Sequence, residues 1–126
     1  MNTPTRHFYV VDDDLPFGKS LKRLLNARGF AADYFGSAQC FLDSIPPDTP
    51  GYAIVDIHMP GCDGFALMEK MHDLHYSLSV IVITGQTQSD SRDLAMEKGA
   101  VGFLQKPFSE ESLMELIKKD NNGSAG

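Results

Sequence analysis

Short apolar runs alternate with longer amphipathic stretches along most of the chain. The runs predict strands at 8–11, 31–35, 52–55, 80–83 and 102–105. Several of them are continuously apolar and stop at a polar residue, as Phe8-Tyr9-Val10-Val11 stops at Asp12. This pattern is typical of strands that a parallel sheet buries on both faces.

The stretches between the strands carry apolar residues at helical spacing. They predict helices at about 15–28, 38–45, 63–74, 90–98 and from 109 onwards. Ser37, Asp63 and Ser109 are suited to N-caps, and Gly29 is suited to the position just past a helix end. Cys40 stands at an apolar-looking position of the second helix, so we expect it to be a small core residue.

Strict alternation of strands and helices predicts an α/β fold. Right-handed crossovers restrict its topology. We expect one doubly wound, five-stranded parallel sheet of order 2-1-3-4-5, flanked by five helices in a flavodoxin-like arrangement. With 126 residues the chain has the length of one domain, assigned to residues 1–119, and the Asn/Gly/Ser-rich segment 120–126 predicts a linker start or a disordered tail.

Composition and charge exclude several classes of function. The net charge of −6 disfavours direct binding to nucleic acid, whose phosphates an acidic surface repels. No stretch approaches the roughly 20 apolar residues of a membrane span. The polar N-terminus carries no secretory signal and the two cysteines form no disulfide framework, so we expect a cytoplasmic protein.

Polar side chains follow four of the predicted strands where each strand ends. They are Asp12 and Asp13 after the first, Asp56 after the third, Thr84 after the fourth and Lys106 after the fifth. Because parallel strands bring their carboxyl ends to one edge, these groups should converge there. Neighbouring carboxylates need a counterion, and Mg²⁺ suits them. An Asp can also be a nucleophile that forms an aspartyl phosphate, with a Lys and a hydroxyl beside the phosphoryl group.

The third member of the acidic triplet has a simpler explanation. Asp14 directly precedes the first predicted helix, where a side-chain carboxylate caps the free N–H groups. Asp12 or Asp13 alone could be caps too, but two acids remain after one cap has been assigned. Asp56 ends an apolar strand, where a carboxylate is costly without partners. The strand ends therefore predict a Mg²⁺-dependent phosphoryl site.

Short motifs follow one another in an informative order. They are VVDDD (10–14), VDIHMPG (55–61) followed by DG (63–64), IVITG (81–85), GA (99–100) and FLQKPF (103–108). Together they resemble the receiver domains of bacterial two-component response regulators, over residues 6–119. The fourth-strand motif and the final one are most similar to the FixJ-like branch, whose members usually carry a C-terminal helix-turn-helix domain.

The resemblance implies roles for the acidic residues. Asp56 would accept a phosphoryl group from the phosphohistidine of a sensor histidine kinase. Asp13, Asp56 and the backbone carbonyl of His58 would bind Mg²⁺ directly, and Asp12 would act mainly through a bound water. Lys106 would bind a phosphoryl oxygen. The chain would be a CheY-like phosphoacceptor rather than a turnover enzyme, with at most slow self-dephosphorylation.

The resemblance also implies a switch and an output. Thr84 would turn inward to the phosphoryl group and Phe103 would follow it, changing the face made by the fourth helix and fifth strand. Homodimers through that face are common in the family, and the output would be transcription through a DNA-binding domain absent from this chain. Because Phe103 has no hydroxyl to hold it outward, we expect its ring to be buried before phosphorylation too.

Two positions beside the phosphoacceptor are candidates for tuning the phosphoryl lifetime. His58 lies two positions after Asp56, and Gln86 lies two positions after Thr84. Their side chains would face each other across the site and could influence the attacking water.

Other functions suit parts of the same pattern. A receiver-like interaction module would keep the fold without phosphorylation, although the set of site residues argues against loss of the chemistry. A haloacid-dehalogenase-type phosphatase also uses an Asp nucleophile with Mg²⁺, but it needs a second Asp where this chain has His58. A flavodoxin-like cofactor carrier would need a Ser/Thr-rich phosphate loop after the first strand, which this chain lacks.

Overall fold

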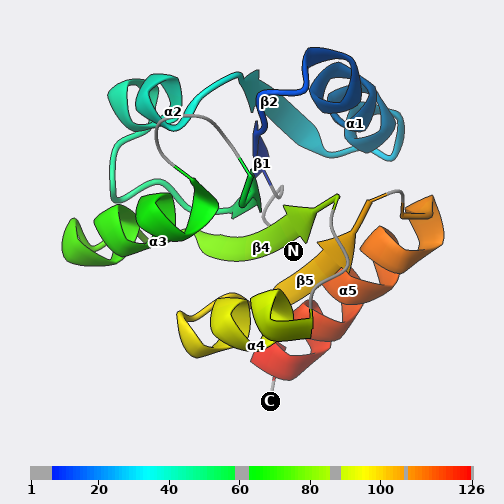
Figure 1. The fold of residues 1–126 in the computed structure, drawn as a ribbon. Coiled ribbons are helices and arrows are strands. Elements are labelled where there is room, and N and C mark those ends of the chain that lie inside the picture. The colour runs from blue at the N-terminus through cyan, green and yellow to red at the C-terminus, as the bar shows by residue number, and fades with distance from the viewer. Residues whose placement is uncertain (1–6, 59–62, 86–88, 107, 126) are drawn as a thin grey trace.

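The computed structural model describes residues 7–58, 63–85, 89–106 and 108–125, and of 89–91 and 119–125 only the backbone. Strands and helices alternate along the chain (Figure 1). The strands are β1 (His7–Val11), β2 (Ala31–Phe35), β3 (Tyr52–Asp56), β4 (Ser79–Thr84) and β5 (Gly102–Gln105). The helices are α1 (Leu15–Ala27), α2 (Ala38–Ser44), α3 (Gly64–Asp73), α4 (Ser89–Glu97) and α5 (Glu110–Ala125).

All strand pairs of the sheet are parallel, and the strand order is β2-β1-β3-β4-β5. The predicted fold class is therefore confirmed. The order reverses between β1 and β3, which lie side by side although α1, β2 and α2 separate them in sequence. Ligands of open α/β sheets bind beside such a reversal, at the carboxyl ends of the strands.

The helix ends follow the predicted capping residues. The side chains of Asp14, Ser37 and Asp63 each accept the main-chain N–H of the residue three positions on, at 3.2, 3.1 and 2.8 Å. Gly29 and Gly99 follow α1 and α4 with φ of 91° and 104°, a left-handed conformation that glycine adopts without strain. These local signals place the loops that connect the strand ends to the helices.

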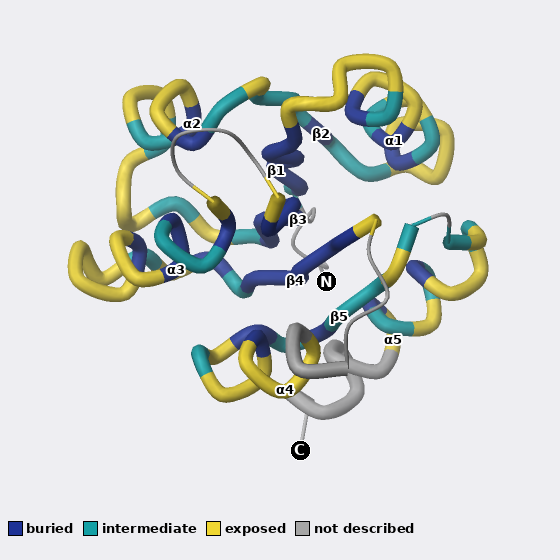
Figure 2. The backbone as a smooth tube through the Cα atoms, viewed as in Figure 1, coloured by how far each residue is buried: buried dark blue, intermediate teal, exposed yellow. Residues whose placement is uncertain are grey.

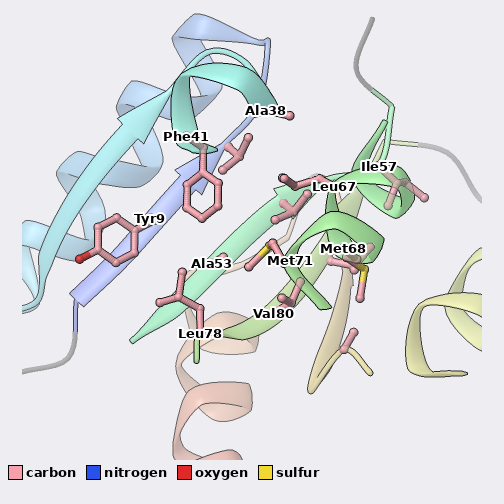
Figure 3. Packing of buried hydrophobic residues seen from close by; sticks show 14 of the residues in the cluster. Tyr9, Ala38, Phe41, Ala53, Ile57, Leu67, Met68, Met71, Leu78 and Val80 are labelled. Carbon is pink, nitrogen blue, oxygen red and sulfur yellow. The ribbon is translucent and has the colours of Figure 1, made fainter. Parts of the chain in front are cut away.

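The helices cover both faces of the sheet and enclose two apolar clusters. One cluster joins the sheet to α1 and α5, and the other joins it to α2, α3 and α4. Figure 2 shows β1, β3 and β4 as the most deeply buried part of the chain. In the α2/α3/α4 cluster the ring of Phe41 is fully buried and lies edge-on to Tyr9, with 6.4 Å between the ring centroids (Figure 3). The interior of the sheet is thus apolar on both faces.

Three details differ from the sequence-based expectations. Cys40 is exposed, so its assignment to the core was wrong. The short helix α2 buries Ala38 and Phe41, and Cys40 lies off the stripe that these two residues define. The helix α5 continues to Ala125, into the segment predicted as a linker or tail, and the domain limit at 119 stays a prediction. In α5, Leu113 and Ile117 are buried, whereas Leu116 is only partly buried.

Within the described ranges, no helix is both long enough and apolar enough to cross a membrane.

Candidate functional site

The carboxyl ends of the strands bring the predicted site residues together. Asp12 follows β1, Asp56 ends β3, Thr84 ends β4 and Lys106 follows β5. We call these four residues and Asp13 the acidic edge. Asp12 and Thr84 are fully buried and Asp56 is 5% exposed, whereas Asp13 is exposed. Asp12, Asp56 and Thr84 are the only buried polar or charged side chains among the described residues, and all of them lie at this edge.

Lys106 lies between the two buried carboxylates. Its Nζ is 2.7 Å from Asp12 Oδ2 and 3.2 Å from Asp56 Oδ2. The main-chain N–H of Lys106 donates to the carbonyl of Thr84 at 2.7 Å, which continues the pairing of β5 with β4 beyond the last strand residue. One ammonium therefore contacts two carboxylates that come from different strands.

An aromatic side chain of α1 also contacts this lysine. The Nζ of Lys106 lies 4.2 Å from the ring centroid of Phe17, and the Phe17 ring packs edge-on against Phe108 at 5.8 Å. A cation over an aromatic face is attracted by the ring quadrupole. Phe17 was predicted only as part of an amphipathic helix, since nothing in its spacing distinguishes a ring that contacts the site from a core ring.

Three carboxylates and one ammonium do not balance. Asp12, Asp13 and Asp56 each offer an oxygen, and these oxygens all lie within 4.8 Å of one another. If all were ionised beside Lys106, two negative charges would remain, which one divalent cation would neutralise. Burial, aided by the nearby charge of Asp56, raises the pKa of Asp12 to about 6, against the lowering effect of the Lys106 ammonium and of the hydrogen bond from the Asp14 N–H. Burial lowers the pKa of Lys106, but the nearby carboxylates of Asp12 and Asp56 outweigh it and raise that pKa overall.

One oxygen of Asp12 is left without an aligned donor. Asp12 Oδ1 accepts the Asp14 N–H at 2.9 Å, but Oδ2 is buried with no hydrogen bond of good geometry from the described residues. The Lys106 ammonium approaches Oδ2 to 2.7 Å as an ion pair. Buried carboxylate oxygens of this kind are suited to a hard cation or to its water shell. The donor set therefore fits Mg²⁺.

The phosphoacceptor candidate is held through its own loop. Asp56 Oδ1 accepts the main-chain N–H of His58 at 2.9 Å. Gly64, the first residue of α3, lies so close that an added Cβ would be 2.8 Å from the Asp56 carbonyl oxygen and 2.7 Å from Ile57 Cα. Only a glycine fits here without moving the backbone of the strand end. The motif that contains Gly64 was found in the sequence, but this contact was not.

A tyrosine of β2 was not predicted as part of the site. The Tyr34 hydroxyl donates to the carbonyl oxygen of Asp12 at 2.6 Å. An added Cβ at Gly18 of α1 would lie 2.0 Å from Tyr34 Cε1, so the Tyr34 ring occupies the space that the side chain of any residue other than glycine would need at position 18. A glycine inside a helix pattern is the signal that could have indicated this close approach, because it lowers helix propensity without a local reason.

The remaining candidates lie around the acidic edge. Phe103 is only partly buried, packed against the α2/α3/α4 cluster, which falls short of the predicted burial. Its strand, β5, is the last in the strand order and pairs with β4. His58 is exposed, and Gln86 lies outside the described residues. His58 and Gln86 therefore remain predictions as residues that tune the phosphoryl lifetime.

The fold agrees with a comparison to known protein families. The chain matches the response regulator receiver domain family over residues 8–118, and it belongs to that family. It is therefore a receiver domain of two-component regulators and not a classical enzyme.

Two curated relatives and one solved structure illustrate the similarity. The chain is 37% identical over 116 residues to the transcriptional regulatory protein FixJ of Bradyrhizobium diazoefficiens, a match that covers 92% of this chain and 57% of that protein. It is 33% identical to the DNA-binding transcriptional regulator NtrC of Klebsiella pneumoniae, over 88% of this chain and 24% of that protein. The crystal structure of FixJ-N has a TM-score of 0.85 at 34% identity and covers 92% of this chain and 93% of its own. The chain thus spans about half or less of these curated relatives.

Proposed function

We propose that Asp56 accepts a phosphoryl group from the phosphohistidine of a sensor histidine kinase, and that this transfer switches the domain. The observation that carries the proposal is the buried Asp56 carboxylate 3.2 Å from Lys106 Nζ, with two further carboxylates beside it. A buried carboxylate with a charged partner at a strand end is an expensive arrangement, and it is typical of functional sites.

The transfer balances without a further reactant. A carboxylate oxygen of Asp56 attacks the phosphorus, an O–P bond forms, and the P–N bond of the phosphohistidine breaks. The electron pair of that bond returns to the imidazole nitrogen, and this nitrogen takes up a proton from water, so that the kinase histidine leaves as neutral imidazole. The product is an acyl phosphate on Asp56.

The acidic edge would hold Mg²⁺ during this reaction. Asp13, Asp56 and the backbone carbonyl of His58 would be ligands, and Asp12 would act mainly through a bound water. When bound, Mg²⁺ would neutralise charge on the phosphoryl oxygens. Lys106 then has a role of its own, because its ammonium can leave a carboxylate for a phosphoryl oxygen close by.

The switch would run from Thr84 to the face made by α4 and β5. Thr84 is fully buried at the end of β4, one strand from Asp56, and its hydroxyl would bond the phosphoryl group. Phe103 is only partly buried, and a further inward movement of its ring would reshape that face. Homodimerisation through this face, as a population shift favoured by the aspartyl phosphate, would transmit the signal.

The output would be the control of transcription. FixJ and NtrC are transcriptional regulators by name, and this chain spans 57% and 24% of their lengths. By analogy, a DNA-binding domain would respond to the state of this receiver, while the receiver itself, with a net charge of −6, would not bind DNA directly.

The test is phosphorylation with a small-molecule phosphodonor, followed by intact mass measurement. With Mg²⁺ the chain should gain one phosphoryl group that base removes, and chelation of Mg²⁺ should suppress the gain. Asp56→Asn keeps the shape of the side chain and should gain none. An unmodified wild-type chain would instead favour an interaction module that works without phosphorylation, and multiple turnover of phosphoesters would favour a phosphatase.

A further inference from the structure

We propose that Tyr34 is a positioning residue for the metal site: its hydroxyl fixes the peptide between Asp12 and Asp13 and thereby sets the affinity for Mg²⁺. The inference rests on the proposed function, because it takes the acidic edge as a Mg²⁺ site. It adds a residue from β2, a strand that contributes no carboxylate to that edge.

Hydrogen bonds fix the main chain of Asp12. Its N–H donates to the carbonyl of Phe35 at 3.1 Å, and its C=O accepts the Tyr34 hydroxyl at 2.6 Å. Its Oδ1 accepts the Asp14 N–H at 2.9 Å. Both main-chain polar groups of Asp12 are therefore fixed by adjacent residues of β2, and Oδ2 is the polar atom that faces Lys106.

The planar peptide bond between Asp12 and Asp13 couples the positions of the two residues. The Asp12 carbonyl belongs to the same rigid plane as the Asp13 N–H, so a bond to that oxygen fixes the orientation of the whole unit. Asp13 follows directly and is the exposed carboxylate of the cluster. Without the phenol, rotation of this plane would shift the direction in which the Asp13 side chain leaves the backbone. The relative placement of two carboxylates thus depends on one hydroxyl.

The Tyr34 ring fits closely against α1. Its hydroxyl reaches Asp12 because the ring passes Gly18 of α1, where an added Cβ would lie 2.0 Å from Tyr34 Cε1. The site-side end of α1 also supplies Phe17, whose ring contacts Lys106. Two adjacent residues of α1 therefore act on the site. Gly18 leaves room for the Tyr34 ring, whose hydroxyl bonds the Asp12 carbonyl, and Phe17 contacts Lys106, the ion-pair partner of Asp12.

A purely structural role for Tyr34 is the competing explanation, and the chain offers a matched control. The Tyr76 hydroxyl donates to the carbonyl of Ile45 at 2.7 Å, also part-buried and between residues distant in sequence. This bond lies between the loops that follow α2 and α3, away from the acidic edge. Both bonds should stabilise the fold alike, but only the Tyr34 bond should affect metal binding.

The experiment is calorimetric titration of the intact chain with Mg²⁺ alone, for the wild type, Tyr34→Phe and Tyr76→Phe. Phenylalanine keeps the ring, so both variants should fold, and urea unfolding should show similar small losses of stability. We expect the dissociation constant for Mg²⁺ to rise about tenfold in Tyr34→Phe, the scale of substitutions around metal ligands, and to stay unchanged in Tyr76→Phe.

A second readout separates positioning from chemistry. With a small phosphodonor, Tyr34→Phe should need about tenfold more Mg²⁺ for half-maximal phosphorylation, while its rate at saturating Mg²⁺ stays near that of the wild type. Equal Mg²⁺ affinities for Tyr34→Phe and the wild type, or equal losses in both variants, would overturn the inference and leave the proposed function intact. A wild-type chain that binds no Mg²⁺ would overturn both.

Discussion

The same strands bury two different kinds of side chain. In their middle, Val10, Ile54 and Val82 are apolar and fully buried; at their carboxyl ends, the sheet buries Asp12, Asp56 and Thr84. The apolar interior stabilises the fold, since each buried aliphatic side chain contributes about 1.5–3 kcal/mol relative to exposure. Burial of a charge has the opposite sign unless it is paired. The interior therefore stabilises the fold, whereas the acidic edge, where three carboxylates share one ammonium, lowers stability in the absence of a metal.

Truncation of a ring in the interior should have the largest effect on stability. Phe41 is fully buried at the contact between α2, β1 and the loop that follows α3. Phe41→Ala should lower the free energy of unfolding by about 3–5 kcal/mol, because it removes buried apolar area and leaves a cavity. Urea unfolding measures this directly. Leu74→Ala is the matched control, as Leu74 is 52% exposed, and a comparable loss there would contradict the account.

A substitution at the acidic edge should change stability in the other direction. In the absence of metal, Asp12→Asn removes a negative charge that burial disfavours more than the Lys106 contact favours it. The variant leaves Lys106 paired with Asp56 and keeps an oxygen that can accept the Asp14 N–H. We expect unfolding free energy at pH 7 to rise by about 1–2 kcal/mol. Urea unfolding in a chelator checks this, and added Mg²⁺ should stabilise the wild type more than the variant. If Asp12→Asn were less stable than the wild type without metal, the proposed difference between the apolar interior and the acidic edge would be wrong.

The pH dependence of the metal-free protein should show the same cost. The pKa of Asp12 is raised from 3.8 to about 6 by burial, so between pH 4 and 6 the folded state binds the proton more tightly than the unfolded state. From this group, stability is therefore greater at pH 4 and is lost as the pH rises through about 6. The advantage of Asp12→Asn over the wild type should shrink by about 1 kcal/mol or more on going from pH 7 to pH 4. An advantage independent of pH would contradict the assignment.

The third Asp of the triplet should behave like a residue of the scaffold. Asp14 caps α1 through the Phe17 N–H, and only its main chain contacts Asp12. Asp14→Ala should therefore lower stability by about 1 kcal/mol, the usual loss for a cap. Its Mg²⁺ affinity, measured by calorimetry, should stay within a few-fold of the wild type. Asp13→Ala is the comparison, because it should keep the stability of the wild type and lose Mg²⁺ binding. A large loss of Mg²⁺ affinity in Asp14→Ala would contradict the assignment of Asp14 to the scaffold.

Much of the fold and of the acidic edge could be predicted because both depend on local sequence signals. Apolar runs that stop at a polar residue mark both the strands and their carboxyl ends, and the topology then brings Asp12, Asp56 and Lys106 together. The capping residues Asp14 and Asp63 are equally local. Motifs, periodicity and topology are therefore sufficient for elements and for residues that lie at strand ends.

The contacts that required the structure depend on three-dimensional fit. The path of the Tyr34 ring past Gly18 to the Asp12 carbonyl joins three elements, and no periodicity encodes it. The exposure of Cys40 depends on which face the short helix α2 turns to the sheet. Phe103 is only partly buried because it lies on the last strand of the sheet, a position that an apolar pattern does not distinguish from a central one.

The most direct test of the central claim locates the phosphoryl group on the chain. The protein would be phosphorylated with a small phosphodonor and Mg²⁺, reduced with borohydride to convert an acyl phosphate into an alcohol, and mapped by peptide mass spectrometry. The account predicts homoserine at position 56 and unmodified Asp at positions 12 and 13. Homoserine at position 12 or 13, or a phosphorylated chain with Asp56 intact, would contradict it.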